Sequence, residues 1–379
     1  MTWEEIFGMA KYKEITFDDI EHLLEKNEAD KEFANRLLKQ RNTNYNPYPK
    51  GWNRHDFYKE ILSDNYIDGF VMGYPHGRVV KQARRSYYYR GENQVYPSSK
   101  SSLCRRITQI TDEKLKQVEK FIASLRIAKF GHFLLQFKHT QKFLEMNLNL
   151  LYKQLAQHYG LETQWLDFTS DFEVALFFAC CKCNDENEWS PLTREDFDAN
   201  DDTRYGIIFQ KDANPLKETA LLFSGALQIW PIGFQPFMRC HMQSGYAAQM
   251  SCAQDLKEEE QFEMLRFKHS EKLSSFIFER MERGGKVFPH EGLNSMLSEI
   301  NGIKTRKIFS EATFDFVCTE GEIPDRNKLK DLLENYGYSI GDIPLNDYPS
   351  DKIQKVNEQY EDFDVEKTYG IKLRTRHTR

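Results

Sequence analysis

The sequence predicts an α+β fold with a central mixed sheet flanked by helices and a helical N-terminal extension. Some segments repeat apolar residues every three or four positions, others are short and rich in aromatic and β-branched residues, and the two kinds do not alternate regularly. With 379 residues, 40% of them apolar and 29% charged, the chain can bury a substantial core.

The N-terminal region is predicted to be a polar, mostly helical extension. A helix is expected over residues 16–38 and a turn-rich stretch over 42–53. From Tyr66 onward the aromatic and β-branched content rises, and strands are predicted over 66–73 and 79–90. We therefore divide the chain into three regions: 1–80 as the N-terminal extension, 81–305 as the main domain and 306–379 as a C-terminal extension.

The main domain and the C-terminal extension are expected to mix helices and strands. Helices are predicted over 112–128, 140–159, 172–183, 261–282, 291–300 and 326–336. Strands are predicted over 163–168, 206–210, 226–230, 238–247 and 313–318. Ser170 and Glu173 are expected to form a capping box for the apolar helix that follows them. The polar stretch 342–364 and the basic residues at the end of the chain are interpreted as a loosely held tail.

Several protein classes are disfavoured by composition. Without a run of about 18 apolar residues or a signal-like start, the chain is expected to be cytoplasmic and not to contact a membrane. The seven cysteines show no spacing typical of a disulfide framework or of a zinc or other metal site, and Cys180, Cys181 and Cys183 are interpreted as small core residues at a helix end. A net charge of −6 argues against a protein that coats nucleic acid.

The first candidate for chemistry is the segment Tyr87–Glu92, with the sequence Tyr-Tyr-Tyr-Arg-Gly-Glu. Arg90 offers a fixed set of donors for a phosphate or carboxylate, and Gly91 would let a ligand approach the backbone. The alternative is an exposed aromatic strand that ends in a solvated arginine, and the residues alone leave both open.

The second candidate is the segment Leu155–Thr169, in which His158, Asp167 and Thr169 lie among apolar neighbours. The apolar helix that follows would direct its positive N-terminal end toward them, which suits an anion. The alternative is structural, with His158 satisfied at a helix end and Asp167 bracing a turn.

Taken together, the order of these motifs resembles that of the FRG domain family over residues of about 85–300. The segments that carry the resemblance are Tyr89-Arg90-Gly91, Leu103 with Arg105 or Arg106, Ala156-Gln157-His158-Tyr159-Gly160, Trp165-Leu166-Asp167-Phe168-Thr169, Ala175-Leu176-Phe177-Phe178-Ala179, Arg239 to Gln243 with Gly245-Tyr246, and Phe288-Pro289-His290-Glu291-Gly292-Leu293. Two departures are the Phe168 ring in place of the family's tryptophan, which keeps an aromatic side chain, and Asp171-Phe172 before the apolar helix, which adds a charge near the site.

This resemblance implies a layout similar to that of ADP-ribosyltransferases, with NAD as the substrate. In such a layout Arg90 would bind NAD, Tyr159 and Thr169 would form the nicotinamide pocket, and Gln243 would take the position of the catalytic Glu or Gln. The other residues expected to contact NAD are Tyr89, Gly91, His158, Asp167 and Phe168. An amide cannot act as a base, so Glu92 or Glu291 would have to assist Gln243.

Three functions are compatible with the sequence. The first is a transferase that ADP-ribosylates a protein or a nucleic acid, as a bacterial toxin or phage-defence effector with an antitoxin or regulatory partner. The second is a nucleotide-sensing or interaction module without turnover. The third is a nucleic-acid-binding or nuclease-like protein with a basic patch formed by Lys81, Arg84, Arg85, Arg105 and Arg106. The sequence assigns no single role to the N-terminal extension or the C-terminal tail, and the alternatives are binding of a partner and covering of the cleft, for the extension as an inhibitory lid.

Overall fold

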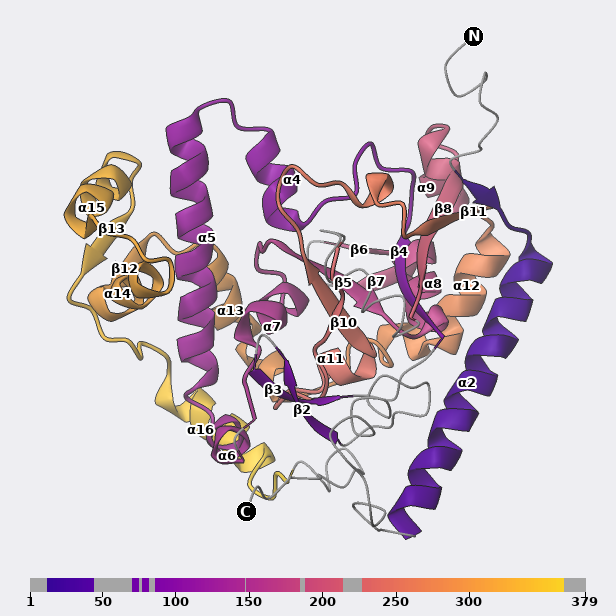
Figure 1. Cartoon of the computed structure of the whole chain (residues 1–379), viewed down its shortest axis with the longest axis horizontal. Coiled ribbons are helices and arrows are strands. Elements are labelled where there is room, and N and C mark those ends of the chain that lie inside the picture. Colours follow the sequence, from indigo (N-terminus) through magenta and orange to yellow (C-terminus); the bar gives the residue numbers. More distant parts are fainter. Residues whose placement is uncertain are drawn as a thin grey trace, which may run out of the picture.

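The fold is built around a seven-stranded mixed sheet (Figure 1), which confirms the α+β class. The computed structural model describes residues 12–43, 70–74, 77–81, 86–146, 148–184, 188–213 and 227–364, without the side chains of 33–43, 70–74 and 77–81. In spatial order the strands are β1 (Lys13–Glu14), β11 (Glu263–Lys268), β8 (Tyr205–Asp212), β4 (Tyr87–Glu92), β5 (Trp165–Thr169), β10 (Gly245–Gln249) and β9 (Trp230–Pro231). Only the β1–β11 pairing is parallel among these strands.

Smaller elements surround this sheet. Three two-stranded sheets are formed by β2 (Phe70–Tyr74) with β3 (Gly77–Lys81), β6 (Cys181–Cys183) with β7 (Trp189–Pro191), and β12 (Ile308–Ser310) with β13 (Ser339–Gly341). The α-helices are α2 (Phe17–Thr43), α4 (Ser102–Thr108), α5 (Glu113–Leu134), α6 (Lys138–Glu145), α7 (Tyr152–His158), α8 (Phe172–Cys180), α9 (Arg194–Phe197), α11 (Arg239–Met242), α12 (Glu271–Arg280), α13 (Leu297–Lys304), α14 (Glu311–Glu320), α15 (Arg326–Asn335) and α16 (Ser350–Gln359). Short 3₁₀ helices are η1 (Asp202–Arg204), η2 (Leu256–Glu258), η3 (Glu282–Gly284) and η4 (Gly292–Met296).

Strand β4 lies in the middle of the sheet, and its side chains point alternately to the two faces. Tyr89 packs with α8 on one face, whereas Tyr88 packs with Phe168 and other residues on the opposite face. Because residues two apart in a strand share a face, Arg90 lies on the same face of the sheet as Tyr88. β4 pairs with β8 along its whole length but with β5 only at Tyr89 and Thr169, so β4 and β5 separate beyond that point.

Helix α8 covers one face of the sheet and is buried along almost its whole surface. Its N-cap is Asp171, whose carboxylate accepts a hydrogen bond from the Glu173 amide at 3.1 Å, so the predicted cap at Ser170 was one residue early. The helix ends at Cys180, because Cys181 to Cys183 form strand β6 instead of the predicted last turn.

The contact between α8 and β4 depends on Gly91. A Cβ atom added at this position would lie 1.8 Å from the carbonyl oxygen of Ala175 and 2.9 Å from the amide nitrogen of Ala179. The missing side chain therefore makes room for the backbone of the helix rather than for a ligand.

The described part of the N-terminal extension is attached to this same layer. β1 extends the sheet next to β11, and α2 lies at that edge of the molecule (Figure 1). Ile20 and Leu24 of α2 are buried in the same core cluster as side chains of α8. The predicted helix over 16–38 is confirmed, and Thr16 and Asp19 cap it with reciprocal hydrogen bonds.

A buried polar network joins α2 to the start of α8. The Asn27 side chain donates to the Asp171 carboxylate at 2.9 Å and accepts from the Phe172 amide at 3.0 Å. Lys31 and Arg280 both contact the buried Glu173 carboxylate at 2.5 Å. The structure thus holds the described part of α2 against the core.

A second helical layer forms around α5, which stands beside the C-terminal helices in Figure 1. Its apolar side chains pack with Phe309, Phe314 and Leu333 of the C-terminal extension. Within the described residues, no helix combines the length and apolarity needed to cross a bilayer.

Two predicted helices of the main domain were wrong. The single helix expected over 140–159 is divided into α6 and α7, with an irregular connection between them. The segment expected to be a helix over 261–282 begins as strand β11. Met264 is buried on one face of this strand, and Leu265 and Phe267 are buried on the other. A strand that is apolar on both faces lacks the alternation by which strands are recognised.

Three predictions for other segments were also wrong. The strand expected over 313–318 is helix α14, capped by the Ser310 hydroxyl. The tail expected over 342–364 contains helix α16, which buries Val356 in the core cluster around α7. Cys104 and Cys252, 148 residues apart, form a disulfide that no local spacing indicated.

Candidate functional site

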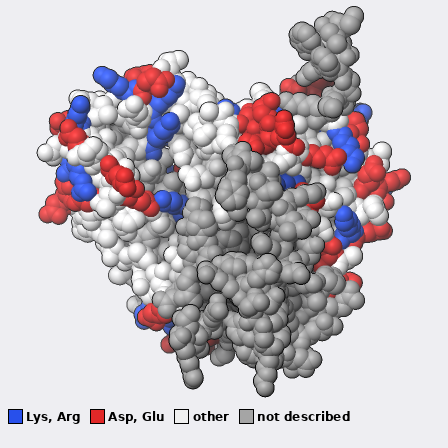
Figure 2. All heavy atoms as spheres, in the orientation of Figure 1, with Lys and Arg blue, Asp and Glu red and all other residues white. Residues whose placement is uncertain are grey.

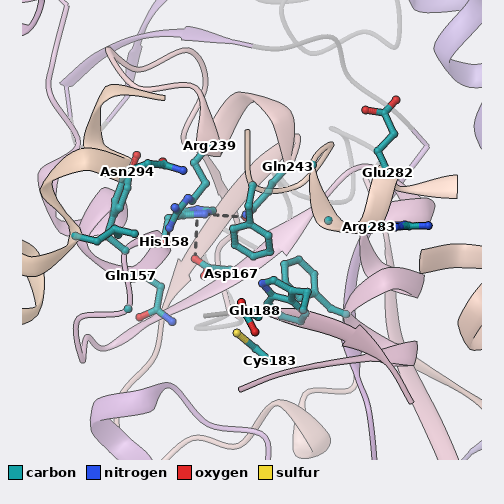
Figure 3. Close-up of a pocket in the computed structure, with 18 of the residues that line it drawn as sticks. Gln157, His158, Asp167, Cys183, Glu188, Arg239, Gln243, Glu282, Arg283 and Asn294 are labelled. Carbon is teal, nitrogen blue, oxygen red and sulfur yellow. Dashed lines mark hydrogen bonds and ion pairs between the residues drawn. The ribbon is translucent and has the colours of Figure 1, made fainter. Parts of the chain in front are cut away.

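A cavity of about 810 Å³ is lined by Asp167, the middle residue of strand β5, and by Phe178 of α8, and Figure 3 shows the side chains around it. Its walls come from α7, β5, the β6–β7 hairpin, α11, η3, η4 and α13. This volume lies in the range of small-molecule sites in proteins. The lining combines aromatic rings with polar and charged side chains.

The polar floor of the cavity is centred on His158, at the C-terminal end of α7. Its Nδ1 atom lies 2.9 Å from Gln243 Oε1, and the amide group of Gln243 donates in turn to the Val287 carbonyl at 3.1 Å. Because Gln243 presents its oxygen to the ring, Nδ1 must carry the proton. In the tautomer with the proton on Nδ1, the lone pair of Nε2 faces the cavity.

Asp167 faces this lone pair, with its Oδ1 atom 3.6 Å from His158 Nε2 (Figure 3). Neither atom has a hydrogen-bond partner among the described residues. Burial raises the pKa of Asp167, while the charges of His158 and Arg90 and a hydrogen bond from Gln157 oppose the rise. In this tautomer, a proton or a ligand hydroxyl group shared by Nε2 and Oδ1 would satisfy both atoms.

Arg239 of α11 lies next to His158 in the lining of the cavity. Its Nη1 atom donates to the His158 carbonyl at 2.8 Å, and its guanidinium lies 4.3 Å from the centre of the Tyr159 ring. The Tyr159 hydroxyl donates to Glu291, whose other carboxylate oxygen accepts from the Met238 amide at 2.7 Å. Burial raises the pKa of both Tyr159 and Glu291.

An aromatic wall closes the side of the cavity nearest η3. The rings of Trp189 and Phe288 stack with their centres 5.0 Å apart and an angle of 18° between their planes. Phe178 meets Phe288 edge to face at 6.1 Å. These surfaces can receive a flat ligand ring.

Several residues predicted for the site do not line this cavity. Arg90 donates to the backbone oxygen of Asp167 at 3.1 Å and pairs with Glu92 at 3.2 Å, so it bridges the gap where β4 and β5 separate. Tyr89 packs in the core with α8, and Gly91 contacts that helix. Strand alternation places Arg90 on the other face of the sheet, away from Tyr89.

The remaining predicted residues divide into two groups. His158, Tyr159, Asp167 and Gln243 all line the cavity. Thr169 and Phe168 do not appear in its wall. The Thr169 hydroxyl donates to the Gln243 carbonyl at 2.7 Å and accepts from the Asp171 amide at 2.9 Å, which positions the loop that carries Gln243.

Three further contributors to the cavity were not given a role from the sequence. Arg239 stands among Phe237, Met238 and Cys240, and a charged residue in such an apolar stretch was a usable signal of a partnered or ligand-facing cation. Trp189 and Lys304 had no comparable signal, because they reach the cavity only through the hairpin and through α13.

Comparison with known proteins gives one match. A search of curated proteins and a search of solved structures each found no match to the chain. Residues 85–188 match the family model of the FRG domain, a span that includes β4, α7, β5 and α8. The chain therefore carries an FRG domain, and the resemblance predicted from the motifs between Tyr89 and Thr169 is confirmed.

Proposed function

We propose that the chain is an NAD-dependent ADP-ribosyltransferase with a transferase-like core, acting on a protein or nucleic acid from within the cytoplasm as a toxin or defence effector. The observation that carries the proposal is the pair formed by His158 Nε2 and Asp167 Oδ1, which meet at 3.6 Å in a cavity with an aromatic wall. In the proposed complex a ribose hydroxyl of NAD would bridge these two buried atoms, with its oxygen at about 2.8 Å from each.

The chemistry assigns a different task to each side chain. When the bond between the nicotinamide nitrogen and the ribose breaks, its electron pair leaves with nicotinamide and the ribose becomes cationic. The Asp167 carboxylate stabilises that charge, and the Asp167–His158 pair accepts the proton that the attacking group loses. The nicotinamide ring would pack against the aromatic wall, in which Trp189 and Phe288 already stack on each other.

Gln243 acts as a positioning residue in this scheme. Its oxygen orients His158 and its amide group is held by Val287, so neither end is free to contact the ribose. Glu92 does not assist because it lies with Arg90, and Glu291 is occupied by Tyr159 and the Met238 amide.

The proposal is tested by incubating the protein with NAD labelled in the adenylate part and a cell lysate, then measuring released nicotinamide and the label on macromolecules. Asp167→Asn, which keeps the shape of the side chain, is expected to lower turnover about 100-fold or more. The matched control Asp198→Asn changes an exposed carboxylate outside the cavity. Equal turnover by Asp167→Asn and the control would refute the assignment.

A second function is favoured by one observation. The side-chain oxygen of Gln243 bonds His158 and its side-chain nitrogen bonds the Val287 carbonyl. Gln243 is therefore not free to act as the third catalytic side chain expected for a transferase. Binding of NAD to the wild type without nicotinamide release would identify a nucleotide-sensing module instead.

The nucleic-acid alternative has less support from the described residues. Arg106 is neutralised by Glu162 at 2.7 Å and by Glu119 at 2.5 Å. Arg84 and Arg85 lie outside the described residues, as does the side chain of Lys81. On the described surface visible in Figure 2, basic and acidic side chains are interspersed.

A further inference from the structure

Two cations at one end of the cavity have no acidic partner. Arg239 and Lys304 both line the cavity, and among the described residues neither forms an ion pair with a carboxylate. Arg239 is 9% exposed, and its Nε atom makes no hydrogen bond within the described part of the chain. Figure 3 shows Arg239 and Asn294 toward one end of the cavity and Glu282 and Arg283 toward the other.

The backbone of residues 158–160 brings the two cations together. Arg239 bonds the His158 carbonyl and stacks on Tyr159, whereas Lys304 Nζ would lie 2.9 Å from a Cβ atom added at Gly160. Burial and the charge of Arg239 both lower the pKa of Lys304. Gly160, with φ of +77°, leaves this corner open because it carries no side chain.

The nearby carboxylates do not neutralise this corner. Glu291 influences Arg239 electrostatically, but its oxygens are engaged by Tyr159 and the Met238 amide. Asp167 has a raised pKa and faces His158. A buried cation without a matching anion is costly, and that cost is relieved when a ligand supplies the negative charge.

We propose that Arg239 and Lys304 form an anion subsite that binds the phosphate groups of a nucleotide, with the Gly160 corner as its floor. The unpartnered oxygen of Asn294 lines the same cavity and can accept a hydrogen bond from a ribose hydroxyl. Naming a dinucleotide as the ligand rests on the proposed function, whereas the affinity for phosphate does not. The diphosphate would then bind on the α8 face of the sheet and not at Arg90.

The subsite is tested by isothermal titration of the full chain with two probes that differ only in phosphate, ADP and adenosine. The wild type is expected to bind ADP more tightly than adenosine, and added salt is expected to reduce that difference. Lys304→Gln is expected to weaken ADP binding about tenfold while leaving adenosine binding unchanged. The matched control Lys307→Gln removes the same charge from an exposed position close by in the sequence and is expected to bind both probes like the wild type.

Arg239→Lys provides a second variant that keeps the charge but loses the planar donor group, and it is expected to weaken ADP binding as well. Circular dichroism and the thermal midpoint establish that each variant is folded before titration. Equal affinity of the wild type for ADP and adenosine, or unchanged ADP binding by folded Lys304→Gln, would overturn the subsite.

The outcomes separate the two proposals. Phosphate-dependent binding that is lost in Lys304→Gln, without consumption of NAD, supports the subsite and removes the transferase. Consumption of NAD together with equal binding of ADP and adenosine supports the transferase and removes the subsite.

Discussion

Replacing Gly91 with alanine is expected to force strand β4 away from helix α8. The new methyl group would lie 1.8 Å from the Ala175 oxygen, 2.8 Å from the Ala175 carbonyl carbon and 2.9 Å from the Ala179 nitrogen. All three are backbone atoms of a helix, so no side-chain rotation can relieve the overlap. Overpacking of a core costs about 1–3 kcal/mol and occasionally more, and we expect a loss of about 3 kcal/mol or more in the free energy of unfolding.

The assay is urea denaturation followed by circular dichroism, with Gly302→Ala as the control. Gly302 lies within helix α13, and a Cβ atom there would have no neighbour within 4 Å. Alanine at that position is expected to be neutral or to stabilise the fold by about 0.5–1 kcal/mol through its helix propensity. If Gly91→Ala unfolds at the same urea concentration as the wild type, the close approach of α8 to β4 is not what requires glycine.

Three further perturbations follow from the buried polar groups. Burial and the charge of Lys142 lower the pKa of His139 to about 3. On acidification the unfolded chain therefore binds a proton before the folded chain does, and the free energy of unfolding is expected to fall by up to about 1.4 kcal/mol per pH unit below pH ~6.5. His139→Phe should reduce this slope in denaturation measured between pH 4 and 7, and an unchanged slope would contradict the role of His139. Asn27→Ala removes the partner of the Phe172 amide and should cost about 1–2 kcal/mol in thermal or urea unfolding; wild-type stability would show that α2 contributes no such cap. Tyr159→Phe leaves the buried Glu291 without one donor and should cost about 1–3 kcal/mol, which is checked by the same unfolding assay and refuted by an unchanged midpoint.

The fold class and part of the polar cavity floor could be predicted from the sequence, because the residue patterns that indicate them are local. His158 and Asp167 stood out as polar residues in an apolar segment, and the structure brings them together. Arg90 does not line the cavity, because strand alternation places its side chain on the face opposite α8, and the sequence of a strand does not show which of its faces borders a cavity. In the structure Gly91 lies against the backbone of α8, so Tyr89 and Gly91 face this helix and Arg90 faces away from it.

Errors in secondary structure arose where tertiary packing determines the periodicity. Within residues 263–268, Met264 is buried on one face and Leu265 and Phe267 on the other, so the strand lacks a clear alternation of apolar and polar residues. Thr313, Phe314, Val317 and Cys318 are buried at helical spacing, yet their β-branched and aromatic composition favoured a strand. The Cys104–Cys252 disulfide joins segments 148 residues apart, and such a pairing has no local signature.

The order of strands in the main sheet limits how the FRG segment can be studied in isolation. Within residues 85–188, β4 and β5 are paired with each other only at Tyr89 and Thr169. Their principal partners, β8 and β10, come later in the chain. A fragment cut at residues 85 and 188 would expose unpaired strand edges and is expected to aggregate rather than fold. During synthesis the sheet therefore remains incomplete until residue 268 has been made, because β1 and β8 both pair with β11.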